Sequence, residues 1–244
     1  MIVTFAVVGH RGAMAEAPEN TVASYRRAED IGVEEVETDV RISADGQLFM
    51  LHDATLDRVA ATPAGRDLGP VADLEWSVIR SVDVGDGERV PTLEEMYQVT
   101  TRTIQLEIKA LEAIDALPDF FGEHRDYAAR TILTGFSIEA MAAVAEKLPE
   151  IPRGIITFSW NEADQHPGGY QALIKETGSS RIHCGWEGLT AEVVERLHEE
   201  GFPVHVWPTR EQDDLRRALE LGVDGTTSDD PRTLLSWLAA LQES

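Results

Sequence analysis

The residues best suited to chemistry lie in about the first fifth of the chain. They are found in the motifs His10-Arg11-Gly12, Pro18-Glu19-Asn20-Thr21, Glu37-x-Asp39, Asp45-Gly46 and His52-Asp53. Two histidines, two carboxylates at alternating spacing and an arginine are together typical of metal-assisted phosphoryl chemistry. Because a purely structural segment has no need of this combination, the pattern favours an enzyme.

The carboxylates suggest a metal site. Glu37 and Asp39 are two residues apart on a predicted strand, so both point to one face. A hard divalent cation, Mg²⁺ or Ca²⁺, would offset their repulsion. Glu107 on a later strand is a candidate third ligand, and Lys109 could reach a phosphate oxygen. The alternatives are a half-buried strand with one carboxylate at a solvent edge, and a simple ion pair between Glu107 and Lys109.

The histidines suggest proton transfer. His10 and His52 each end a predicted strand, and imidazole titrates near neutral pH, so one could accept a proton while the other donates one. Arg11 is suited to binding phosphate through its guanidinium fork. His205 lies in the middle of a strand and could face the barrel. Trp207 could form a wall of the substrate pocket, or it could fill the core.

Composition limits the partners. The 244 residues carry a formal net charge of -23, which disfavours nucleic acid and anionic membranes as partners. Cys184 is the single cysteine, so an internal disulfide is excluded. We interpret Met1–Val8 as the beginning of a strand and not as a signal peptide, and no apolar run is long enough for membrane insertion. These features predict a cytoplasmic protein.

The order of elements predicts an α/β fold, a (β/α)₈ TIM barrel. Barrel strands are expected at Val3–Gly9, Glu35–Ile42, Thr103–Ile108, Thr131–Thr134, Arg153–Phe158, Arg181–Cys184, Pro203–Trp207 and Val223–Thr227. Helices are expected at Thr21–Ile31, with Asn20 as its N-cap, and at Leu93–Thr100, Ile138–Lys147, Ala191–Glu200 and Asp213–Leu221. Leu48–His52 follows so short a turn that it must be an antiparallel hairpin arm. We expect one domain over residues 1–244, with a small insertion after the second strand at about residues 54–91. An open doubly wound sheet is the alternative.

Together these motifs resemble the glycerophosphodiester phosphodiesterases. The resemblance adds Leu56-Asp57-Arg58, Pro91-Thr92-Leu93-Glu94-Glu95, Leu106-Glu107-Ile108-Lys109 and Gly222-Val223-Asp224-Gly225 to the motifs above, in the family's order. It implies a TIM barrel that hydrolyses glycerophosphodiesters to glycerol 3-phosphate and an alcohol, in lipid and glycerol metabolism. It also implies a divalent metal on Glu37, Asp39 and Glu107.

The resemblance further gives the acid and base roles to His10 and His52, and places Arg11 and Lys109 on the phosphate of a small-molecule substrate. It implies attack by the substrate's own hydroxyl, a cyclic phosphate, and opening of that ring by water. Two segments depart from the family pattern: Gly135-Phe136 replaces Ser-Phe, and Trp207-Pro208-Thr209-Arg210 replaces Trp-Thr.

Two alternatives stay open at this point, a non-catalytic barrel that binds a phosphate ligand and a lyase that releases the cyclic phosphate. The sequence assigns neither the leaving alcohol, nor the metal, nor which histidine is the base, nor the oligomeric state.

Overall fold

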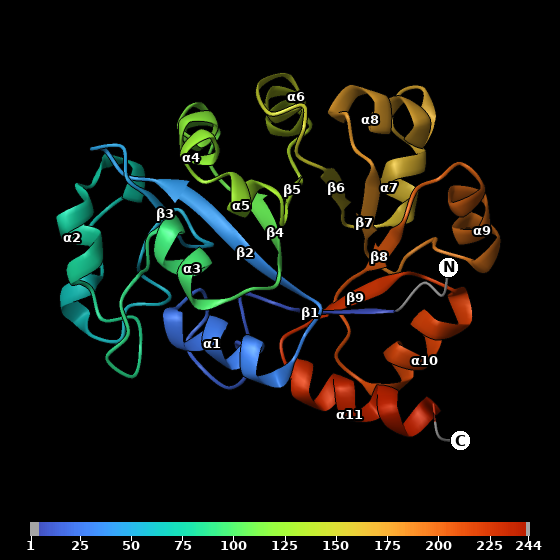
Figure 1. Ribbon diagram of the computed structural model, residues 1–244, viewed down its shortest axis with the longest axis horizontal. Helices are drawn as coiled ribbons and strands as arrows, with labels where there is room; N and C mark the ends of the chain where they lie inside the picture. The colour runs from blue at the N-terminus through green and yellow to red at the C-terminus, as the bar shows by residue number, and fades with distance from the viewer. Residues whose placement is uncertain (1–4, 243–244) are drawn as a thin grey trace.

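A closed parallel barrel forms the centre of the molecule (Figure 1). The computed structural model describes residues 5–242, and these form nine strands in one sheet. The strands are β1 (Ala6–Gly9), β2 (Glu35–Ile42), β3 (Leu48–Met50), β4 (Thr103–Ile108), β5 (Thr131–Gly135), β6 (Arg153–Thr157), β7 (Arg181–Cys184), β8 (Val204–Val206) and β9 (Gly225–Ser228). Because β1 pairs in parallel with both β2 and β9, the sheet closes, which confirms the barrel and excludes the open alternative.

Helices surround the barrel (Figure 1). They are α1 (Val22–Ile31), α2 (Trp76–Ser81), α3 (Leu93–Val99), α4 (Leu117–Glu123), α5 (Arg125–Ala128), α6 (Ile138–Lys147), α7 (Trp160–Asp164), α8 (Gly169–Thr177), α9 (Ala191–Glu199), α10 (Gln212–Leu221) and α11 (Pro231–Gln242), with short 3₁₀ turns η1 (Pro63–Gly65), η2 (Val71–Asp73) and η3 (Leu111–Asp115). The predicted helices agree with these bounds to within about a residue. In the part of the chain that the structure describes, no helix combines the length and the apolar character needed to cross a membrane.

Charged and polar side chains reach across the barrel interior. Glu35 of β2 lies 3.3 Å from Arg181 of β7, a strand that does not neighbour β2 in the sheet. Likewise, Gln105 Nε2 of β4 lies 3.4 Å from His205 Nδ1 of β8, which places His205 inside the barrel. Side chains alternate along a strand, so Glu37 and Asp39 of β2 face the interior as Glu35 does.

Among the described residues, the first strand begins at Ala6 and ends at Gly9 as predicted. The first two residues of the predicted strand, Val3 and Thr4, lie outside the described residues. The hairpin arm β3 pairs antiparallel with β2, as its short connection predicts.

Residues 54–91, together with Phe49 and Leu51, pack around a second hydrophobic core. This second core is separate from that of the barrel and consists of Phe49, Leu51, Leu56, Ala60, Val71, Ile79, Val82, Val84 and Val90. It includes residues of β3 and α2, which lie together at one side of the barrel (Figure 1). The segment therefore has enough buried apolar surface to hold its loops in a fixed position beside the barrel mouth.

The predicted N-cap of the first helix is wrong. Thr21 caps α1, and its side chain accepts a hydrogen bond from the Ser24 amide. Asn20 adopts a left-handed conformation, with φ 54°, and its amide nitrogen donates to Asp39 Oδ2 at 2.8 Å. Thr38 and Tyr25 donate to the Asn20 side-chain oxygen, so Asn20 belongs to a buried polar network. Through the Asn20 amide, this network holds the Asp39 carboxylate in a fixed orientation.

Candidate active site

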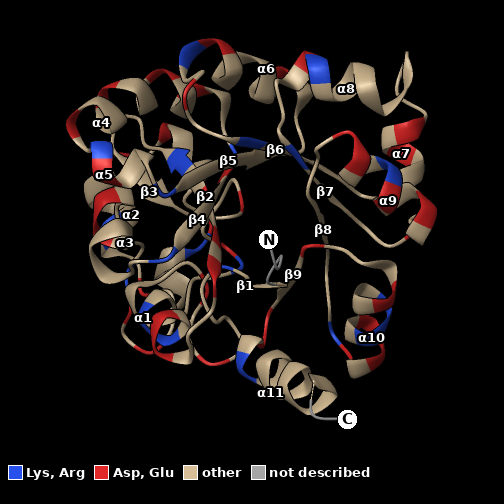
Figure 2. Cartoon of the chain, turned by 45° about the vertical axis from the view of Figure 1, so that its right-hand side comes forward, with Lys and Arg blue, Asp and Glu red and all other residues tan. Residues whose placement is uncertain are grey.

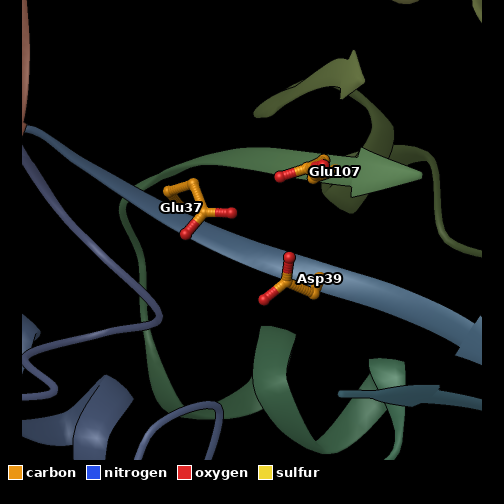
Figure 3. Close-up of side chains that lie close together, drawn as sticks. All are labelled: Glu37, Asp39 and Glu107. Atoms are coloured by element: carbon orange, nitrogen blue, oxygen red, sulfur yellow. The ribbon is translucent and has the colours of Figure 1, made fainter. Parts of the chain in front are cut away.

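Three buried carboxylates meet on the adjacent parallel strands β2 and β4. Asp39 of β2 is the direct register partner of Glu107 of β4, and Glu37 lies one inward position earlier on β2. One oxygen from each residue lies within 4.8 Å of the other two. Figure 3 shows the three side chains on the same side of the two strands. The structure thus brings together the residues for which the sequence predicted a shared site.

Full ionisation of this carboxylate triad is electrostatically unfavourable, even with the neighbouring Lys109. Burial, together with the charge of Asp39, raises the pKa of Glu37 to about 7 and that of Glu107 to about 8. Burial opposes ionisation of Asp39 as well, but the neighbouring Lys109 and Arg11 outweigh it and lower its pKa. Among the described residues, two triad oxygens, Glu37 Oε1 and Asp39 Oδ1, are buried without a hydrogen-bond partner. Three oxygen ligands of this kind fit a hard divalent cation.

Two cations flank the triad. Lys109 Nζ lies 2.6 Å from Glu107 and 3.3 Å from Asp39. Arg11 Nε lies 3.4 Å from Asp39, and its Nη1 donates to Glu19 at 2.7 Å. Burial lowers the pKa of both groups, but the surrounding carboxylates more than compensate, so both pKa values are raised and both groups are charged. Both acidic and basic residues lie on the outer helices around the barrel (Figure 2), and Lys109 and Arg11 are the cations that stand directly beside the triad.

His10 lies at the edge of the triad and has a partner that the sequence did not reveal. Its Nδ1 is 2.5 Å from Asp229 Oδ1, and its Nε2 is 3.7 Å from Glu37 Oε2. Burial lowers the pKa of His10, but the hydrogen bond to Asp229 and the charge of Glu37 outweigh it and raise the pKa overall. Asp229 directly follows β9, which pairs with β1, so only closure of the barrel brings it to His10. The one signal in the sequence is its place after the last strand.

The pKa of His52 is lowered, in contrast to that of His10. Its Nδ1 is 2.6 Å from Asp53 Oδ1, and Arg41 donates to the His52 carbonyl from Nε and Nη2. Burial is the largest influence and lowers the pKa of His52 below its ordinary value, although Asp39 and Asp53 act in the other direction. The two histidines therefore stand at one barrel mouth with pKa values displaced in opposite directions.

Aromatic rings stand near Lys109. The ring of Trp207 contacts Phe136 edge to face, with centroids 5.5 Å apart, and lies 6.0 Å from Phe158. Lys109 Nζ is 5.7 Å from the centroid of Phe136, so this aromatic group adjoins the charged site. Phe158 is exposed over 67% of its surface, which is unusual for a large apolar side chain. Trp207 thus packs against other rings and also stands near the site.

Comparison with known proteins supplies the family. A model of the glycerophosphoryl diester phosphodiesterase family matches residues 10–233. A glycerophosphodiester phosphodiesterase of Caldanaerobacter subterraneus subsp. tengcongensis is 28% identical over 94% of this chain and 96% of that relative. One from Bacillus subtilis is 26% identical over 92% of this chain and 83% of that relative.

A solved structure shows the same fold. An Oleispira antarctica phosphodiesterase in complex with the product sn-glycerol-3-phosphate has a TM-score of 0.85, with 24% identity and 96% of each chain covered. Since the family match includes the triad, both histidines and Asp229, the chain belongs to the glycerophosphoryl diester phosphodiesterase family.

Proposed function

We propose that this chain hydrolyses glycerophosphodiesters to glycerol 3-phosphate and an alcohol, with the help of a divalent cation. Family membership makes the chain a phosphoric diester hydrolase. The observation that carries the proposal is the meeting of Glu37, Asp39 and Glu107, with Arg11, Lys109 and His10 directly beside them. The product bound to the Oleispira antarctica protein is consistent with this substrate class.

The triad would hold the cation, and the flanking groups would hold the phosphate. A divalent cation at this place would polarise the phosphoryl oxygens and offset the charge that develops on them. Arg11 and Lys109 stand next to the triad and supply further positive charge toward the same oxygens. Trp207 would form part of the wall of the alcohol side of the pocket.

The two histidines divide the proton transfers. His52, with its lowered pKa, is neutral near neutral pH and accepts a proton from the attacking hydroxyl of the substrate's glycerol. His10, whose pKa is raised, is the better proton donor of the two and donates to the oxygen of the leaving alcohol. The hydroxyl oxygen forms a bond to phosphorus as the bond to the alcohol breaks, which gives a cyclic phosphate. Water then opens the ring, and each histidine takes the opposite role.

A substrate panel tests this function. Glycerophosphocholine and glycerophosphoethanolamine are incubated with the protein in EDTA and after addition of Mg²⁺ or Ca²⁺, and phosphorus NMR identifies the product. We expect glycerol 3-phosphate only when a cation is present. Full turnover in EDTA would refute the metal role. A cyclic phosphate as the final product would identify a lyase, and binding without any product would identify a binding barrel.

A further inference from the structure

Arg58 lies in a turn that the second core holds in place. The motif His52-Asp53-x-x-Leu56-Asp57-Arg58 contributes only His52 to the proposed chemistry. Leu56 and Ala60 are buried in the second core, and the amides of Val59 and Ala60 both donate to the Leu56 carbonyl. Arg58 lies between these two anchors in the chain, and its side chain is 47% exposed. Its backbone is therefore fixed while its guanidinium reaches the barrel mouth.

The Arg58 guanidinium joins two loops of the site. Its Nε donates to Asp53 Oδ2 at 2.6 Å. Its Nη1 and Nη2 donate to the two oxygens of Glu19, at 2.6 and 2.8 Å. Asp53 uses its other oxygen on His52 Nδ1, and Glu19 Oε1 also accepts from Arg11. Arg58 thus contacts Asp53, which orients the proposed base His52. It also contacts Glu19, which orients Arg11, a proposed phosphate ligand.

We infer that Arg58 is a positioning residue that sets the His52 imidazole and the Arg11 guanidinium relative to each other, through Asp53 and Glu19. The inference rests on the proposed function, because it takes its roles for His52 and Arg11 from there. A guanidinium suits this task because its donors lie in one rigid plane, so two carboxylates bound to it have a fixed mutual orientation.

The network is more than an ordinary surface ion pair. Glu19 is only 11% exposed, and it is held by Arg58 and Arg11 together. The hydrogen bonds from Arg58 and His52 lower the pKa of Asp53 to about 2, against its partial burial. Asp53 therefore stays ionised at working pH and keeps its oxygen on His52 Nδ1. Without Arg58, each carboxylate loses a donor, so that within the described part of the chain Asp53 is held by His52 alone and Glu19 by Arg11 alone.

A kinetic double-mutant comparison tests the inference. We expect R58Q to lower kcat about 10-fold, as loss of an orienting partner does, and to raise KM. The kcat of R58Q/D53N should equal that of D53N, and the KM of R58Q/E19Q should equal that of E19Q, because each pair acts in one chain of contacts. R89Q removes a guanidinium from the ion pair of Arg89 with Asp83 in the same insertion and should leave both constants unchanged.

Three kinetic results would overturn the inference. They are wild-type constants in R58Q, losses in the double variants that simply multiply, and full recovery in R58K. Lysine keeps the charge but has no planar fork, so its full recovery would show that charge alone suffices.

A readout without turnover separates the inference from the proposed function. Nitrogen-15 spectra of the imidazoles, with His52 assigned by H52A, should show one tautomer with Nδ1 protonated in the wild type and a mixture in R58Q. If the wild type hydrolyses no glycerophosphodiester, the proposed function fails, and these spectra alone decide on Arg58. An unchanged His52 tautomer in R58Q would refute its positioning role.

Discussion

The variant E107Q should change stability in opposite directions with and without a divalent cation. Glu107 is buried beside Glu37 and Asp39, and glutamine keeps its shape while removing its charge. In EDTA the substitution removes an unfavourable buried carboxyl and should stabilise the fold. With Mg²⁺ or Ca²⁺ it removes a charged ligand and should weaken the stabilisation that the cation gives.

The size of the first effect follows from the pKa. In the metal-free protein the pKa of Glu107 is raised from 4.5 to about 8, a value that already includes its attraction to Lys109. Folded protein therefore keeps a proton that unfolded protein releases between these two pH values, so stability falls as pH rises across this window. At 1.36 kcal/mol for each pH unit, the loss is about 3 kcal/mol at pH 7 and about 1 kcal/mol at pH 5. E107Q should remove this loss.

Urea unfolding followed by far-UV circular dichroism measures both effects. In EDTA at pH 7, E107Q should have a free energy of unfolding about 3 kcal/mol above that of the wild type, and at pH 5 the difference should shrink to about 1 kcal/mol. At a cation concentration about 100 times its Kd, the wild type should gain about 2.7 kcal/mol, and E107Q should gain less. E220Q removes one negative charge from an exposed position on α10 and serves as the control for net charge.

Two results would refute this reasoning. One is a lower stability of E107Q than of the wild type in EDTA at pH 7, because the carboxyl would then be favourable where it stands. The other is an equal gain from the cation in both proteins, because Glu107 would then contribute nothing to binding it.

Three further predictions concern other parts of the site. H10A and H52A should each lower kcat by about 10²–10⁴-fold with an unchanged circular dichroism spectrum; near-normal turnover in either would contradict its proton-transfer role. D229N should lower the pKa of His10, because its burial stays while the carboxylate that offsets it is lost, and NMR titration of the imidazole should show this shift; an unchanged pKa would contradict it. G12A should destabilise the fold by more than about 1 kcal/mol in urea unfolding, because Gly12 has φ +91° and an added Cβ would lie 2.3 Å from Ser24 Oγ; wild-type stability would show that the loop relaxes freely.

The carboxylate triad could be predicted because its geometry is local. Glu37 and Asp39 share a face through the alternation of β2, and Lys109, one residue past the end of β4, lies beside Glu107. Parallel barrel strands place their C-terminal ends at one mouth, so the two pairs were expected to meet there. The register of Asp39 against Glu107 agrees with that expectation.

The N-cap prediction failed because a tertiary demand overrides local preference. Asparagine and threonine are both good N-cap residues, so the sequence Asn20-Thr21 permits either one. Asn20 is turned inward because the buried Asp39 carboxylate needs a donor, and Thr21 then caps the helix. The buried charge of Asp39, and not the N-cap preference of the helix, therefore determines the position of the Asn20 side chain.

Whether the hydrogen-bond partner of a histidine could be predicted depends on how far away that partner lies in the chain. Asp53 is adjacent to His52, so that pair is visible in the sequence. Asp229 lies 219 residues from His10 and reaches it only after β9 closes the barrel against β1. The sequence therefore shows a partner for His52 but none for His10, and only the folded barrel raises the pKa of His10 and lowers that of His52. The proposed acid and base roles depend on barrel closure through Asp229, so D229N should alter the proposed proton donation by His10 while leaving the His52–Asp53 pair intact.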